Sequence, residues 1–106
     1  MYKLIVFVPK ASLEGVKEAI FCTGAGSTCN YVDCSWQSDG LGQFKPVGGA
    51  NPGIGTLGCL ETVLEVRLEI LCSKSNVRKA VWAMRDAHPY EEPAFEIIEL
   101  VNVDSL

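Results

Sequence analysis

The sequence predicts an α+β domain whose elements follow the order strand, helix, two strands, helix, strand. Residues 2–8 form a continuous apolar run, and residues 60–71 alternate between apolar and mostly charged side chains, so both segments indicate strands. Residues 12–24 and 75–88 repeat apolar side chains at the spacing of a helix face. The chain is short enough for a single core, and we expect residues 1–106 to form one domain.

The first half of the chain is expected to supply a central strand, a helix and a hairpin. The β-branched and aromatic side chains of residues 2–8 are typical of a strand that is buried on both faces. Ser12 is a candidate N-cap for the helix that follows, and Gly24 is a candidate stop. Strands at residues 30–36 and 43–47 would be joined by a glycine-containing turn, which predicts the hairpin.

The second half begins with a glycine-dense loop at residues 48–58, and such loops in small domains often carry function. The long strand at residues 60–71 follows. Ser75 can cap the second helix, which must end before Pro89 because proline disfavours helical geometry in the preceding residue. Residues 94–103 are apolar enough to form the closing strand. This β-α-β-β-α-β order predicts a ferredoxin-like antiparallel sheet with two helices on one face.

The predicted first strand is apolar on both sides, whereas two helices can cover only one face of the sheet. A single chain therefore lacks a second layer, and another copy of the chain is its simplest source. We accordingly expect a homo-oligomer. The acidic face of the 60–71 strand argues against burying this side of the sheet in a homo-oligomer, unless its carboxylates contact water or a cation such as Arg67.

Composition argues against several kinds of partner. The 13 acidic and 9 basic residues give a net charge of -4, and no run of basic residues could neutralise successive phosphates, which makes nucleic acid a poor partner. No apolar run is long enough for a signal peptide or a membrane span, so no membrane is expected. Five cysteines without a C-x-x-C pair indicate reduced thiols and a cytoplasmic location.

The segment at residues 88–93 concentrates polar chemistry, because two prolines stiffen a backbone that carries an imidazole, a phenol and two carboxylates. In a structural interpretation, the prolines shape a connection and the tyrosine packs. In a functional interpretation, the segment binds a divalent ion such as zinc, copper or nickel, which accept imidazole and carboxylate ligands. The candidate metal ligands are His88, Glu91, Glu92, Glu61 and Glu65.

Two other patterns carry weaker signals. Gly53-x-Gly55-x-x-Gly58 matches the dinucleotide fingerprint, but a strand follows it instead of a helix, so loop geometry explains the glycines better. A small enzyme that uses His88 as acid or base with Glu92 or Cys34 is an alternative function. A purely structural oligomerisation module is a third.

Motifs along nearly the whole chain resemble those of one family. They are Gly24-Ala25-Gly26, Asn30-Tyr31, Cys34-Ser35, Gly40-x-Gly42-x-Phe44-x-Pro46, Gly49-Ala50-Asn51-Pro52-x-Ile54-Gly55, Leu60-Glu61, Glu65-x-Arg67-x-Glu69 and His88-Pro89-Tyr90-Glu91-Glu92-Pro93-Ala94-Phe95. Together they resemble the domain inserted in many Nif-three-like proteins, the GTP cyclohydrolase I type 2 homologues. The resemblance implies a stand-alone form of that domain, similar to the PII and CutA proteins, which are commonly trimers.

The resemblance implies a non-enzymatic PII-like or CutA-like module with a regulatory or divalent-metal-binding role, acting as a homotrimer or another homo-oligomer. The two-metal chemistry of the longer Nif-three-like proteins belongs to a separate, histidine-containing domain and is not implied here. A small ligand or a metal ion would be bound by the loops of residues 40–58 and 88–93. The candidate ligand-binding residues are Tyr31, Cys34, Gly40, Gly42, Phe44, Asn51, Pro52, Gly55 and Tyr90.

Overall fold

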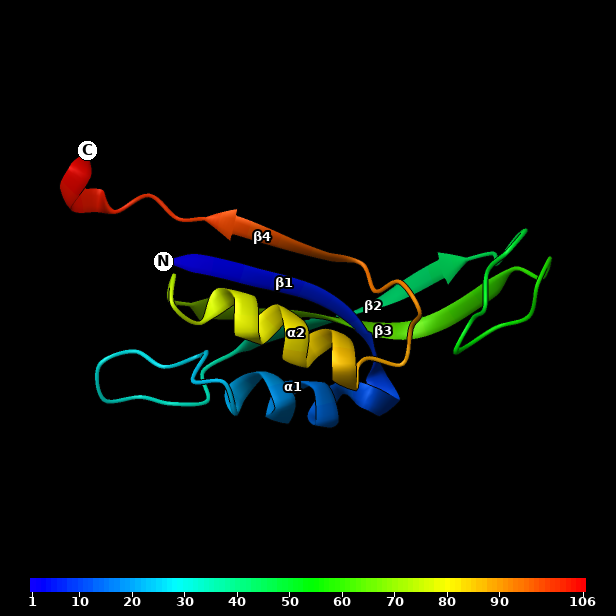
Figure 1. Cartoon of the computed structure of the whole chain (residues 1–106), viewed down its shortest axis with the longest axis horizontal. Coiled ribbons are helices and arrows are strands. Elements are labelled where there is room, and N and C mark those ends of the chain that lie inside the picture. The colour runs from blue at the N-terminus through cyan, green and yellow to red at the C-terminus, as the bar shows by residue number, and fades with distance from the viewer.

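The computed structural model describes residues 1–106 and confirms the expected order of elements (Figure 1). Its sheet has the strand order β2-β3-β1-β4, all neighbours are antiparallel, and β1 is therefore central, as predicted. Neither helix has the length and apolar content that crossing a membrane requires. The elements are β1 (Tyr2–Pro9), α1 (Leu13–Phe21), β2 (Trp36–Phe44), β3 (Glu61–Cys72), α2 (Val77–Ala87) and β4 (Phe95–Glu99), with 3-10 turns at Lys10–Ser12 and Val103–Ser105.

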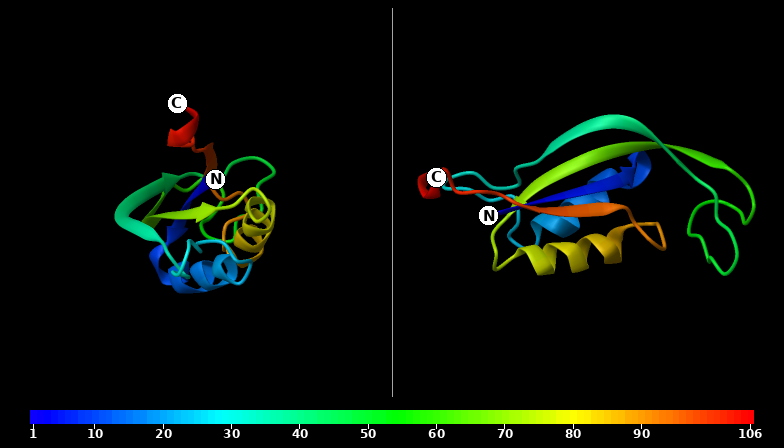
Figure 2. Two further views of the ribbon diagram at one scale, coloured as in Figure 1. Left: turned by 90° about the vertical axis from the view of Figure 1, so that its left-hand side faces the viewer. Right: turned by 90° about the horizontal axis from the view of Figure 1, so that it is seen from above.

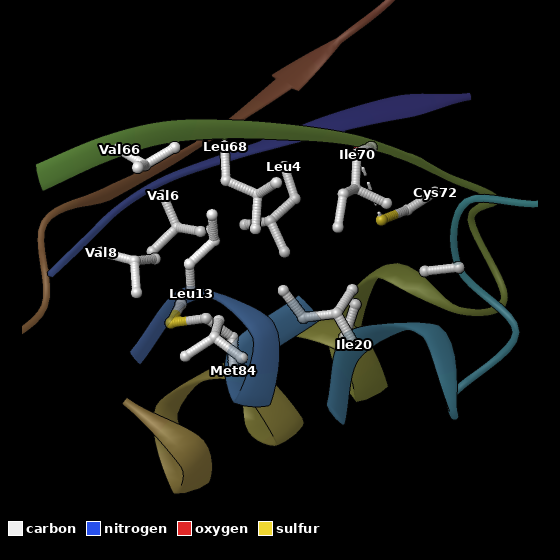
Figure 3. Packing of buried hydrophobic residues seen from close by; sticks show 13 residues of the cluster. Leu4, Val6, Val8, Leu13, Ile20, Val66, Leu68, Ile70, Cys72 and Met84 are labelled. Atoms are coloured by element: carbon white, nitrogen blue, oxygen red, sulfur yellow. Dashed lines mark hydrogen bonds between the residues drawn. The ribbon is translucent and has the colours of Figure 1, made fainter. Parts of the chain in front are cut away.

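Both helices pack on the same face of the sheet, and the opposite face carries no second layer (Figure 2). The register of β1 and β3 pairs Leu4 with Ile70 and Val6 with Leu68, so alternate side chains of both strands point at the helices (Figure 3). Full burial of each such aliphatic side chain stabilises the fold by roughly 1.5–3 kcal/mol. The core comprises Leu4, Val6, Val8, Leu13, Val16, Ile20, Ala25, Val66, Leu68, Ile70, Cys72, Ala80 and Met84.

One residue of the central strand is buried on the face away from the helices as well. Ile5 points to that face and is only 1% exposed. Beside it, the Glu69 carboxylate lies 3.2 Å from the Lys3 ammonium and 3.2 Å from the Arg67 guanidinium, which itself lies over the Phe7 ring. The hydrogen bond from Lys3, together with Arg67, lowers the pKa of Glu69. The Glu69 carboxylate of β3 is thus paired with two cations, which offset the cost of placing a charge on this face.

The predicted hairpin at residues 30–36 and 43–47 is wrong. Residues 36–44 form the single strand β2, which passes through Gly40 and Gly42 and pairs with β3 along its whole length. Because β3 is long enough to offer a continuous ladder, the glycines adopt extended backbone and no turn forms. Earlier in the chain, only an isolated bridge joins Thr28 and Tyr31.

Two element ends also differ from expectation. The closing strand was expected over residues 94–103, but β4 ends at Glu99 because its partner strand begins at Tyr2, directly opposite. The second helix is capped at Asn76 and not at Ser75, since the Ser73 carbonyl already accepts the N–H groups of Asn76 and Val77. The residue at which a helix begins or ends is harder to predict from sequence than the face that the helix buries.

All five cysteines are free, but only Cys72 belongs to the core, where burial raises the pKa of its thiol. The other four cysteines do not belong to the core, because Cys22, Cys29 and Cys59 are exposed and Cys34 is half-buried.

Thiol titration distinguishes these environments. In the native protein, we expect a thiol reagent to modify the three exposed cysteines quickly, and to modify Cys72 only after unfolding. The denatured chain should yield all five thiols, and reductant should leave the melting temperature unchanged. A disulfide in freshly isolated protein would contradict both expectations.

Candidate functional site

A pocket of about 490 Å³ lies between two loops at one end of the sheet. Residues 45–60 connect β2 to β3, residues 88–94 connect α2 to β4, and both connections lie at the same end of the molecule (Figures 1 and 2). The volume suits a small molecule. The lining residues are Phe7, Leu41, Gly42, Gln43, Phe44, Lys45, Pro46, Ala50, Pro52, Gly53, Ile54, Glu65, Tyr90, Glu91, Glu92 and Ala94.

Tyr90 is fixed in the pocket wall by two contacts. Its hydroxyl donates a hydrogen bond of 2.6 Å to Glu65 Oε2, and its ring meets the Phe44 ring edge-on with 5.3 Å between centroids. The missing side chain of Gly42 leaves the space that the Glu65 carboxylate occupies. Burial, followed by the bond to Glu65 and the charge of Glu61, raises the pKa of Tyr90 well above its usual range. The phenol therefore stays protonated and remains a donor at neutral pH.

His88 holds this wall in place, because both of its ring nitrogens form hydrogen bonds to backbone groups. The Tyr90 backbone N–H donates to Nδ1 over 3.1 Å, so Nδ1 carries no proton. The neutral ring then carries its proton on Nε2, which donates to the Phe7 carbonyl over 2.8 Å. His88 is buried, and this burial lowers the pKa of its imidazole. The histidine thus anchors the 88–94 loop to β1.

The two loops are joined by direct contacts. The Asn51 backbone N–H donates to both oxygens of the Glu91 carboxylate, at 3.1 and 3.3 Å. Gly53 passes so close to the Pro89 carbonyl oxygen that a Cβ there would overlap it. Gly55 has a φ of +97°, and a Cβ at this position would approach the Phe44 ring to 3.3 Å. The glycine-dense loop is therefore shaped to rest on the 88–94 segment.

Replacing Gly53 with alanine should separate the loops. The new Cβ would clash with the Pro89 backbone, and overpacking of this kind costs roughly 1–3 kcal/mol. We expect a lower melting temperature and faster hydrogen exchange of the Asn51 amide. Gly49→Ala is the matched control, because nothing lies within 4 Å of a Cβ at that position. Equal melting temperatures and equal exchange rates for the two variants would refute the contact.

The structure brings four of the nine predicted ligand-binding residues into the pocket wall. Gly42, Phe44, Pro52 and Tyr90 line the pocket, together with the predicted metal ligands Glu65, Glu91 and Glu92. Gly40, Asn51 and Gly55 lie in the surrounding elements without lining it. Tyr31 and Cys34 belong to the loop between α1 and β2, at the other end of the sheet, so the structure does not bring them to the pocket.

The predicted metal set is not assembled within one chain. No group of three or more His, Cys, Asp and Glu side chains is placed to hold a metal ion. Both nitrogens of the His88 ring are already used, because Nδ1 accepts the Tyr90 N–H and the protonated Nε2 donates to the Phe7 carbonyl. The imidazole therefore offers no free ligand atom. Backbone partners of this kind leave no trace in the sequence, which explains the error.

Several pocket residues were missed by sequence reasoning. Phe7 lies on the buried first strand and Lys45 follows β2, and neither carries a motif that marks it as functional. Gly53 did carry a signal, because it belongs to the glycine-dense loop. Its role became visible only with the position of the Pro89 carbonyl.

Comparisons with known proteins show which proteins the chain is similar to. No family model matches it. It is 45% identical over 102 residues to the GTP cyclohydrolase 1 type 2 homolog of Halalkalibacterium halodurans, covering 96% of this chain and 27% of that protein. It also superposes on a Bacillus cereus protein related to NIF3 with a TM-score of 0.80 and 42% identity, covering 95% of this chain and 26% of that one. Over nearly its whole length, the chain is therefore similar to one segment of the GTP cyclohydrolase 1 type 2 homologs and NIF3-related proteins.

The NIF3-family match is confined to one part of the relatives, because the chain spans about a quarter of their length. A second comparison, with a solved structure of low sequence identity, gives information only about the fold. The periplasmic divalent cation tolerance protein CutA from Archaeoglobus fulgidus superposes with a TM-score of 0.67 at 12% identity, covering 96% of this chain and 86% of that one. The predicted CutA-like and PII-like ferredoxin-like fold is thereby confirmed.

Proposed function

We propose that this chain is a non-enzymatic, CutA-like and PII-like binding module that works as a homo-oligomer in the cytoplasm and takes a small ligand in the loop pocket. The observation that carries the proposal is the pocket itself. Its two walls come from loops far apart in the sequence and are held by the Glu65–Tyr90 and Asn51–Glu91 hydrogen bonds. Walls fixed before binding reduce the ordering entropy that opposes it.

The bare face of the sheet supports assembly. Trp36, Leu71 and Ile98 point to the face away from the helices and are 58%, 37% and 42% exposed. They flank the buried Ile5. An apolar face of this kind in a chain with one helical layer suits contact with another copy, and the family resemblance implies a trimer.

Light scattering tests the assembly. We expect the wild-type chain to be oligomeric at micromolar concentration and Leu71→Glu to be monomeric and folded, because the new charge would be desolvated only in the contact. Leu64→Glu is the matched control, since Leu64 lies on the same strand but points to the opposite face. A monomeric wild type, or equal assembly of both variants, would contradict the proposal.

The geometry does not favour the alternative in which His88 acts as a catalytic acid or base. An acid or base needs a nitrogen within reach of a substrate, and both His88 nitrogens bond to backbone groups. Cys34 lies in a different loop, at the far end of the sheet. A purely structural oligomerisation module would leave the pocket without a ligand. A ligand-binding measurement therefore distinguishes it from the proposed binding module.

A metal-dependent form of the proposal rests on the carboxylates alone. Glu61 and Glu65 both act on the Tyr90 hydroxyl, and Glu91 and Glu92 line the same pocket. Copies that shared these groups would offer zinc, copper or nickel a set of oxygen ligands, although carboxylates without an imidazole suit harder divalent ions better. Native mass spectrometry before and after dialysis against a chelator tests this form. Loss of a stoichiometric metal together with the oligomer would support it, and an unchanged oligomer without metal would refute it.

A further inference from the structure

The charge and hydrogen-bonding character of the pocket points to a class of ligand, an inference that rests on the proposed binding function. The walls carry three carboxylates, Glu65, Glu91 and Glu92, against a single ammonium group, that of Lys45. Phosphate-binding loops, in contrast, present several unpaired backbone N–H groups or several cations. In the loop of residues 45–58, the N–H groups of Ala50, Asn51 and Gly58 are donated to protein oxygens, whereas those of Gly53 and Ile54, which line the pocket, have no partner within the chain.

Among charged groups of the walls, the free carboxylate acceptors of Glu65 and Glu92 outnumber the single cationic donor, Lys45. Glu65 uses Oε2 for the Tyr90 hydroxyl, and its Oε1 lies over Gly42 without a protein partner. The Glu92 carboxylate makes no hydrogen bond within the chain, and the Tyr90 oxygen keeps its lone pairs for a donor. An acceptor-rich site is satisfied by a ligand rich in N–H donors, and charge-assisted bonds from a cation are the strongest of these.

Two further features of the walls favour positive charge. Helix α2 ends at Ala87, directly before the 88–94 loop, and the C-terminus of a helix carries partial negative charge. The rings of Phe7, Phe44 and Tyr90 line the pocket, and aromatic faces attract cations. The nearest basic group on β3, Arg67, is neutralised by its bond to Glu69.

We infer that the pocket binds a small organic cation, an ammonium or guanidinium group attached to an apolar or aromatic body. The charged group would lie between Glu65, Glu92 and the Tyr90 hydroxyl. The body would contact the apolar wall, whose members are Phe7, Phe44, Pro46, Pro52 and Ile54. A bare metal ion would leave that wall unused and would find no third ligand within the chain.

The test compares three probes on the full chain by amide chemical-shift titration. They are 2-phenylethylamine, which is protonated at pH 7, 2-phenylethanol, which has the same body without charge, and ATP. We expect the amine to bind at least about tenfold more tightly than the alcohol, and added salt to weaken only the amine. ATP should leave the pocket amides unshifted.

Two variants locate the charge contact. Glu92→Gln should weaken amine binding several-fold and leave alcohol binding unchanged, because only the charge is lost. Glu99→Gln is the matched control, since Glu99 lies at the opposite end of β4 beside Tyr2. Equal or tighter binding of the alcohol or of ATP at the pocket would overturn the inference and leave the proposed binding function intact. Failure of all three probes to shift any pocket amide would overturn both.

Discussion

Replacing His88 with alanine is expected to destabilise the fold by about 2–4 kcal/mol, because two backbone groups lose their partners at once. The Phe7 carbonyl would lose the Nε2 donor and the Tyr90 N–H would lose its acceptor, both beneath the pocket. Chemical denaturation measures this loss. A catalytic or metal-binding histidine would instead be replaced with little effect on stability, so an unchanged midpoint for His88→Ala would contradict its anchoring role.

The pH dependence of stability gives a second measure of the same residue. Burial keeps the pKa of His88 below the value of about 6.5 that an exposed imidazole has in the unfolded chain. As pH falls below that value, the unfolded state takes up a proton that the folded state does not, so stability decreases. The slope reaches at most about 1.4 kcal/mol per pH unit. His88→Ala should lack this His88-dependent loss, whereas an equal loss in both proteins would exclude His88 as its source.

Ile5→Asp is the second substitution with a large expected effect. Ile5 is 1% exposed between β3 and β4, and a carboxylate there would be buried without a partner of its own, beside the acidic Glu69 and Glu96. We expect a loss of about 3 kcal/mol or more, enough to unfold a domain of marginal stability. Val101→Asp is the control, since Val101 is exposed and should tolerate the charge. Similar unfolding midpoints for both variants would show that the second face of β1 is open to water.

The sequence predicted the layers of the fold because each layer depends on local periodicity. The alternation along β3 and the helical spacing of Val16 and Ile20 correspond to the buried faces that the structure shows. The error at β2 has a different origin. Gly40 and Gly42 permit a turn, but whether they form one depends on the length of the partner strand, which is a property of the pairing and not of the local sequence.

The candidate site was predictable as a meeting of two loops, but not in its chemistry. Glycine density and paired prolines marked the segments that form the walls. The sequence could not show that backbone groups of Phe7 and Tyr90 occupy both nitrogens of His88. Residue type alone therefore favoured metal ligation, whereas the hydrogen bonds show a structural imidazole beneath a pocket of carboxylates and aromatic rings.

Mapping where small molecules bind tests whether the loop pocket is the ligand site of this chain. A set of charged and neutral fragments would be titrated against the isotope-labelled full chain, and the shifted amides assigned. We expect the shifts to cluster at residues 42–46, 50–54 and 90–94, which form the pocket walls. Shifts confined to the helices or to residues 27–35, or no shifts with any fragment, would contradict it.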